Sequence, residues 1–105
     1  MAEEDKKSDR KPFKGAQVLF PFDMPDDMLE DAVLTSKRVM DEHEFDSAGV
    51  EIAKKVKEYF DQKYDPTWHV FLGKQFGCHT IHEKNRFVYF TFDHNNISFL
   101  IYKAK

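Results

Sequence analysis

Residues 76–83 read FGCHTIHE and hold the residue types that bind metals or act as thiol catalysts. Cys78 is the single cysteine of the chain, and His79 and His82 are two of its five histidines. A thiolate and an imidazole can coordinate zinc together, and an imidazole can also activate a thiol as a nucleophile. Either chemistry requires the side chains to converge, so it depends on the local backbone.

The local sequence favours a strand, which separates these side chains. Thr80 and Ile81 are β-branched and lie in the middle of the segment. On a strand, Cys78 and His82 share a face, but their Cα atoms are roughly 13 Å apart. His79 points to the opposite face. We therefore expect no metal site within this segment.

A thiol enzyme or redox sensor centred on Cys78 stays open as an alternative. The base would have to be His69 from a neighbouring strand, and its reactivity would require a lowered thiol pKa. The rest of the sequence contains no phosphate-binding loop, serine elbow or paired-acid motif. The leading expectation is a protein that is not an enzyme, with no catalytic residue, metal or cofactor.

Composition predicts one packed domain in a reducing compartment. The chain has 105 residues, 41% of them hydrophobic, with 11 Phe and a net charge of −3. The charge balance gives no basic surplus for nucleic-acid binding. One cysteine excludes an internal disulfide. Because no apolar run approaches the roughly 20 residues of a membrane span, and the first residues lack the apolar core of a signal peptide, we expect a soluble cytosolic protein.

The first half of the chain predicts a tail, a strand and two amphipathic helices. Residues 1–15 are interpreted as a charged, disordered tail that precedes a domain over 16–105. Residues 16–22 read AQVLFPF and predict a strand at a sheet edge, because Pro21 cannot donate to a ladder. Apolar residues at helical spacing predict helices over 25–43 and from Asp46 or Ser47 to about Tyr64. Pro66 ends the second helix.

After Pro66 the pattern alternates with a period of two, which is typical of strands. Strands are predicted over 68–72, 76–82, 86–92 and 97–102, with turns over 73–75, 83–85 and 93–96. The order is β-α-α-β-β-β-β, so the fold class is α+β: an antiparallel sheet packed with two amphipathic helices. The polar strand 76–82 suits a sheet edge, which can pair with a second copy or accept an extended peptide.

Residues 60–90 read FDQKYDPTWHVFLGKQFGCHTIHEKNRFVYF and closely resemble the dynein light chain type 1 family. The resemblance covers roughly 16–105. It implies a strand-swapped homodimer that binds extended linear peptides, such as the dynein intermediate chain and other proteins with disordered linear motifs. That role promotes partner dimerisation and dynein motor assembly. It further implies a cytoplasmic, microtubule-associated location, with the axoneme as one setting, and neither nucleic acid nor membrane as a partner.

The resemblance also implies site residues, carried over position by position. The implied peptide-binding residues are Gly49, Val50, Lys74, Gln75, Phe76, Gly77, Cys78, His79, Thr80, Ile81, His82, Phe87, Tyr89 and Thr91. The implied dimer-interface residues are Thr67, His69, Cys78, Thr80 and Ile81.

Several positions depart from the family pattern. Gly49 and Val50 occupy the place of a Glu-Lys pair, and Thr91 replaces a tyrosine. Cys78 and His79 stand where Ser and Tyr are usual, and Ile81 replaces a Thr. A divergent monomeric member, or a specialised axonemal one with an altered or lost peptide groove, is therefore the alternative hypothesis.

Overall fold

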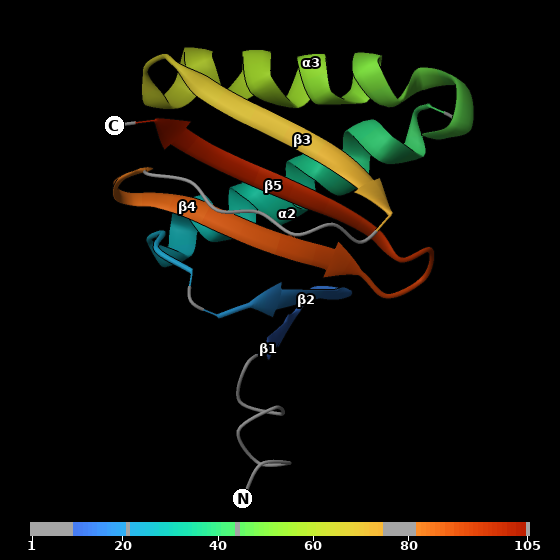
Figure 1. Ribbon diagram of the computed structural model, residues 1–105, viewed down its shortest axis with the longest axis horizontal. Helices are drawn as coiled ribbons and strands as arrows, with labels where there is room; N and C mark the ends of the chain where they lie inside the picture. Colours follow the sequence, from blue (N-terminus) through green and yellow to red (C-terminus); the bar gives the residue numbers. More distant parts are fainter. Residues whose placement is uncertain (1–9, 21, 44, 75–81, 105) are drawn as a thin grey trace, which may run out of the picture.

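The computed structural model describes residues 10–20, 22–43, 45–74 and 82–104, and it confirms an α+β fold (Figure 1). The five strands form one antiparallel sheet in the order β1-β2-β4-β5-β3. Of the strand predicted at 76–82, only His82 lies within the described residues, where it begins β4. The elements in chain order are β1 (Arg10–Phe13), β2 (Ala16–Leu19), α2 (Asp26–Asp41), α3 (Phe45–Tyr64), β3 (Trp68–Lys74), β4 (His82–Phe92) and β5 (Ile97–Ala104).

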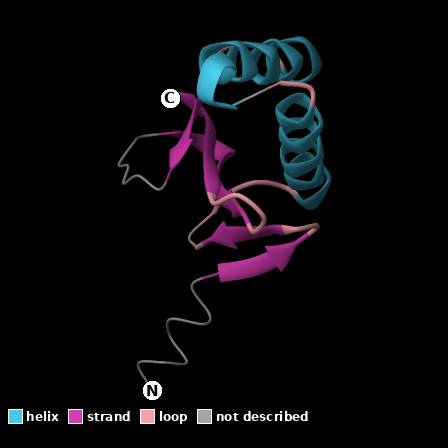
Figure 2. Cartoon of the chain, turned by 90° about the vertical axis from the view of Figure 1, so that its right-hand side faces the viewer, coloured by secondary structure: helices cyan, strands magenta, loops and turns pink. Residues whose placement is uncertain are grey.

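Both helices lie on one side of the sheet and bury its core against it (Figure 2). Most of the apolar residues that recur at helical spacing in the two predicted helices are buried in this core, among them Val33, Val39, Val56 and Phe60. Every second side chain of the central strands points into the same core, as a pleated strand requires. The largest buried side chains of the core are Trp68, Phe60, Phe90, Phe92, Phe99, Leu29, Ile52 and Ile101.

Arg10–Phe13 forms strand β1, so the interpretation of residues 10–15 as disordered tail is wrong. Lys14 and Gly15 both have positive φ, at 51° and 86°, which is the backbone of a two-residue type I′ hairpin turn. Phe13 packs against the core, and the Lys14 ammonium lies 3.6 Å from the Glu30 carboxylate on α2. Packing of the Phe13 ring against the core therefore orders a segment in which charged residues precede and follow this phenylalanine.

This hairpin also changes the place of β2, which was expected at a sheet edge. β2 lies between β1 and β4, and it ends at Leu19; Pro21, on which the expectation was based, lies outside the described residues. The edge is β1, where Pro12 pairs with Gln17. Since the pair that closes a two-residue hairpin exchanges the hydrogen bonds, Pro12 turns its backbone away from β2. Because proline has no N–H, Pro12 gives the outer side of β1 no backbone donor at this position, and the edge is a weaker pairing surface for another strand.

Two predicted turns are also wrong. Gly73 and Lys74 continue β3, and residues 83–85 belong to β4. The register of β4 against β5 shifts between His82 and Phe87, so the strand is irregular at the place where a turn was expected. Asn85 takes a positive φ of 64° there, and its N–H donates to the Asp23 carboxylate at 2.9 Å. The turn-forming residues thus produce an irregularity within a strand.

A substitution at Gly15 tests the hairpin. A Cβ added there meets nothing within 4 Å, so Gly15→Ala adds backbone strain without a clash. We expect a loss of about 1 kcal/mol in the free energy of unfolding, measured by urea denaturation. Gly15→Asn is the control, since asparagine tolerates positive φ, and it should lose less. Equal losses in the two variants would contradict the type I′ turn.

Candidate functional site

The face of the sheet opposite the helices, called here the outer face, carries three aligned rows of side chains. The pairing register defines them, because paired residues on neighbouring strands project to the same side. The first row is His69, Tyr102 and Phe87; the second is Phe71, Leu100 and Tyr89; the third is Gly73, Ser98, Thr91 and Gln17.

The first two rows are mainly aromatic. The Tyr102 ring lies 5.3 Å from the His69 ring and 6.5 Å from the Phe87 ring, measured between centroids. Tyr89 and Leu100 are buried, whereas Phe71 is 52% exposed. Aromatic residues are enriched at surfaces that bind other proteins, and Phe71 adjoins the buried Leu100 and Tyr89 on this face.

Phe71 belongs to the edge strand of the sheet. β3 pairs with β5 along one side, and within the described ranges no strand pairs with its other side. A strand with an open side offers backbone N–H and C=O groups to another extended segment. The edge and the outer face meet at Phe71, so one partner can use both.

The site residues expected from the sequence separate into two groups along the sheet. Figure 1 shows that α3 runs in one direction and the neighbouring β3 returns, so the start of α3 and the end of β3 lie at the same end of the molecule. Gly49, Val50 and Lys74 are therefore at this end. Thr91 joins them, since it pairs with Ser98 in the third row.

The other described candidates lie toward the opposite end or in the middle. Thr67 is exposed just before β3, His69 and Phe87 share the first row, and Tyr89 is in the second. Residues Gln75 to Ile81, which include Cys78 and most of the predicted groove strand, lie outside the described residues, and His82 is described only as the first backbone position of β4.

Asp61 fixes the start of the edge strand, and sequence analysis missed it. One carboxylate oxygen accepts the Trp68 N–H at 2.8 Å, and the other accepts the Lys57 ammonium. Burial opposes ionisation of Asp61, but these hydrogen bonds and the nearby His69 together lower the pKa of its carboxyl. The last turns of α3 are thereby tied to the first residue of β3.

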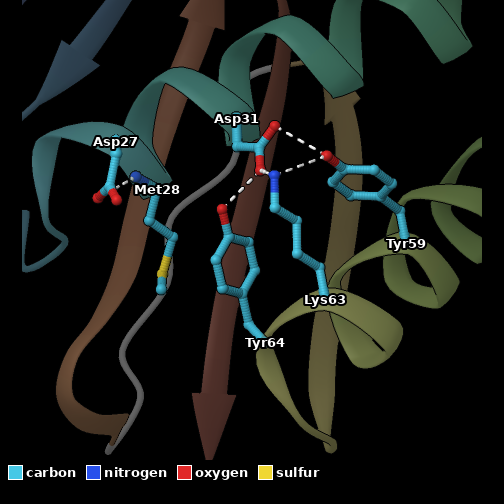
Figure 3. A network of polar contacts seen from close by, with 6 residues as sticks. All are labelled: Asp27, Met28, Asp31, Tyr59, Lys63 and Tyr64. Carbon is cyan, nitrogen blue, oxygen red and sulfur yellow. Dashed lines mark hydrogen bonds and ion pairs between the residues drawn. The ribbon is translucent and has the colours of Figure 1, made fainter.

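A second carboxylate, Asp31, joins the two helices (Figure 3). It lies on α2 and accepts hydrogen bonds from three side chains of α3. The Tyr59 hydroxyl donates to one oxygen at 2.9 Å, while the Lys63 ammonium, at 2.6 Å, and the Tyr64 hydroxyl donate to the other. All the donors come from the last turns of α3, so this cluster fixes α2 against the end of α3.

The charges of this cluster stabilise one another. Burial opposes ionisation of Asp31, but the hydrogen bonds from Lys63, Tyr64 and Tyr59 outweigh it and lower the pKa of the carboxyl. The hydrogen bond to Asp31 raises the pKa of Lys63. Burial and the bond to Asp31 raise the pKa of Tyr64 to about 12. The cluster is thus ionised at Asp31 and Lys63 and neutral at Tyr64 around neutral pH.

Neither acidic cluster resembles a metal centre. Among the described residues, no group of three or more His, Cys, Asp and Glu side chains is placed to hold a metal ion. No helix in the described part of the chain has the length and apolarity needed to cross a membrane.

The Asp31 cluster predicts a specific loss of stability in acid. Because its carboxyl pKa lies below the ordinary 3.8, the stabilisation is present above that pH and is lost as the pH falls through the lowered value. We expect Asp31→Asn to lower the free energy of unfolding by roughly 2 kcal/mol near neutral pH. The difference from the wild type should shrink below about pH 4 in urea denaturation.

Asp41→Asn is the matched control for the Asp31 experiment. Asp41 pairs with Lys37 at 3.0 Å on the exposed side of α2, with 53% of its side chain exposed. A surface pair of this kind contributes little, so the change should stay below about 0.5 kcal/mol. A pH-independent loss in Asp31→Asn would contradict the assigned role of the ionised carboxylate.

The link between Asp61 and Trp68 predicts a second loss of stability. Asp61→Ala removes the acceptor of the Trp68 N–H, and the free energy of unfolding should fall by about 1–3 kcal/mol. Amide hydrogen exchange of residues in β3 should speed up more than that of β4. Lys57→Met, which keeps the carboxylate, is the control and should leave the Trp68 amide protected.

The comparisons with known proteins agree with this fold over nearly the whole chain. A profile of the family Dynein light chain type 1 matches residues 17–104. A "Dynein light chain" of Schistosoma mansoni is 38% identical over 82 residues, covering 78% of this chain and 86% of the relative. The "Dynein light chain 1, cytoplasmic" of Saccharomyces cerevisiae is 37% identical over 91 residues, covering 87% and 94%.

Solved structures support the same fold at lower sequence identity. The dynein light chain-like domain of a Fasciola hepatica calcium binding protein superposes with a TM-score of 0.77 at 16% identity, covering 90% of this chain and 97% of that one. A second crystal structure of that domain gives a TM-score of 0.71 at 18% identity, covering 86% and 91%. On the extent of the profile match and the identity to the two relatives, this chain belongs to the dynein light chain type 1 family.

Proposed function

We propose that this protein is a non-enzymatic dynein light chain that forms a homodimer and holds extended peptides of its partners. The observation that carries the proposal is the side of β3 with which no described strand pairs, next to the exposed Phe71. A second copy is the natural occupant of this edge, because a twofold contact presents the same complementary surface twice. The aromatic rows of the outer face supply apolar area for such a contact.

The family pattern supplies the arrangement of the dimer. It implies that residues 76–82 of one copy pair with the β3 edge of the other, with Thr67, His69, Cys78, Thr80 and Ile81 at the interface. In support, His69 lies on the outer face of the edge strand and Thr67 is exposed just before it.

The same pattern implies that a peptide adds as a further strand to the crossing segment. Main-chain hydrogen bonds would hold the peptide, and side chains along the groove would select its sequence. Two identical grooves then hold two chains side by side. Linked binding of this kind raises avidity through effective concentration and promotes dimerisation of the partner. The proposed groove residues are Gly49, Val50, residues 74–82, Phe87, Tyr89 and Thr91.

The proposed partners are dynein subunits and other proteins with disordered linear motifs. Family membership implies association with dynein, and the intermediate chain is the partner we propose first. The yeast relative is named as a cytoplasmic dynein light chain. By analogy, we place the protein in the cytoplasm on the microtubule cytoskeleton and assign it to dynein motor assembly.

A specialised member with an altered or lost groove is the second candidate. It is favoured by the start of α3, where Val50 is 86% exposed and occupies the place of a charged residue in the family pattern. An exposed valine provides neither the charge nor the hydrogen bonds that would hold a polar peptide side chain. This member would be monomeric, or would serve one dynein of the axoneme.

Sedimentation of the protein alone and with a Thr-Gln-containing intermediate-chain peptide separates the two candidates. We expect a homodimer that binds the peptide with micromolar affinity, two per dimer. Phe71→Asp places a charge on the proposed interface and should produce a folded monomer. A wild-type monomer that takes up no peptide would contradict the proposal, and a dimer that binds none would favour the lost groove.

Leu34→Asp is the matched control for Phe71→Asp. Leu34 is 43% exposed, similar to Phe71, but it lies on α2 and not on the sheet. The Leu34 variant should stay dimeric at the concentration where the Phe71 variant dissociates. Dissociation of both variants would show that the effect is not specific to the β3 edge.

A further inference from the structure

The third row of the outer face differs in chemistry from the other two. Gln17, Thr91, Ser98 and Gly73 align across β2, β4, β5 and β3, in that order. They are small or polar, whereas the neighbouring row presents Tyr89, Leu100 and Phe71. A segment that lies on this face therefore meets small hydroxyl and amide side chains at this end and mainly aromatic rings along the other two rows. That end is also where α3 begins and β3 finishes (Figure 1).

The central pair of this row is a hydrogen bond between two hydroxyls. Thr91 Oγ1 and Ser98 Oγ lie 2.7 Å apart, and either hydroxyl can be the donor on distance alone. Their burial decides between the two. Ser98 is fully buried, whereas Thr91 is only partly buried.

A buried hydroxyl proton needs an acceptor, and Thr91 Oγ1 is the acceptor that the described residues supply to Ser98. The arrangement that satisfies the buried Ser98 proton is the one in which Ser98 donates and Thr91 accepts. The O–H of Thr91 is then not used within the pair and is available to a group outside it. Ser98 fixes the position of the Thr91 oxygen, and Thr91 presents the donor.

The surrounding charge restricts which acceptor fits. Asp93 follows Thr91 by two residues and is exposed, and Gln17, the cross-strand neighbour of Thr91, donates its amide N–H to the Asp93 carboxylate at 3.4 Å. A carboxylate of a ligand would be repelled by Asp93, since like charges close together are unfavourable. A neutral acceptor, the carbonyl of an amide or a hydroxyl, is not.

The geometry points to Thr91 as a specificity-determining residue that donates a hydrogen bond to a neutral polar side chain of the bound peptide, with Ser98 as its positioning residue. The peptide residue selected is Gln, Asn, Ser or Thr, in preference to an apolar or acidic one. This inference rests on the proposed function, because it names the ligand chemistry at one end of the proposed groove. Thr91 is the contact and Ser98 acts through it.

A positional peptide scan tests the inference. The probes are Thr-Gln-containing peptides in which each position in turn carries Gln, Leu or Glu, and binding to wild type and variants is measured by titration. At one position, wild type should bind the Gln peptide about three- to tenfold more tightly than the Leu peptide. The Glu peptide should bind more weakly than the Gln peptide there.

Matched variants separate the hydroxyl donor from the shape of the side chain. Thr91→Val keeps the shape and should abolish the preference, whereas Thr91→Ser keeps the donor and should retain it. Ser98→Ala should weaken the preference, since it releases the Thr91 oxygen. The double variant Thr91→Val with Ser98→Ala guards against misfolding, because removing both partners of a buried hydrogen bond disturbs a fold less than removing one.

The outcomes distinguish this inference from the proposed function. A dimer in which Thr91→Val, or the double variant, keeps the wild-type preference at every position overturns the role of Thr91 alone. A wild-type protein that binds none of the peptides overturns both. Loss of the preference in Thr91→Val with retention in Thr91→Ser, and with dimers intact by sedimentation, supports the donor.

Discussion

The structure depends on one geometric constraint: a β-sheet has two faces, and the two helices cover only one of them. Side chains alternate across each strand, so the residues between the core positions must point to the other side. There the chain places Phe71, Phe87, Tyr89, Leu100 and Tyr102. A sheet with apolar residues on both faces is typical of a protein that packs its second face against something else. The homodimer proposed above would use this second face.

The two carboxylates found between the elements serve this arrangement. Asp31 ties the helices to each other, and Asp61 ties the end of α3 to Trp68, the first residue of β3. Both carboxylates bind partners on a different element or a different helical turn. They therefore restrict the angle between the helices and the position of β3 relative to α3, which hydrophobic packing alone does not specify. The hydrogen bond from Trp68 to Asp61 therefore fixes the position of the first residue of the edge strand β3.

The helices and their buried faces could be predicted because their signals are local. Val33 and Val39 on the first helix, and Val56 and Phe60 on the second, recur at helical spacing and become buried as expected. The roles of Asp31 and Asp61 could not be read in this way, because an acidic residue within a helix usually faces solvent. The sequence gives one indication that Asp31 is not fully exposed, which is its position next to Ala32, a residue of the buried helix face.

Sequence alone determined the two helices, the alternating strands after Pro66 and the family, because these depend on local periodicity and on residue identity along the chain. Tertiary structure decided the following features. It recruited Arg10–Phe13 into the sheet and made β2 internal. It kept residues 83–85 in a strand and aligned Thr91 with Ser98. In each case the deciding partner lies far away in sequence or on another strand: Phe13 is held by the core, Asn85 by Asp23, and Ser98 by Thr91. Pairing across such distances carries no periodic signal in the chain, so only the assembled sheet brings these groups together.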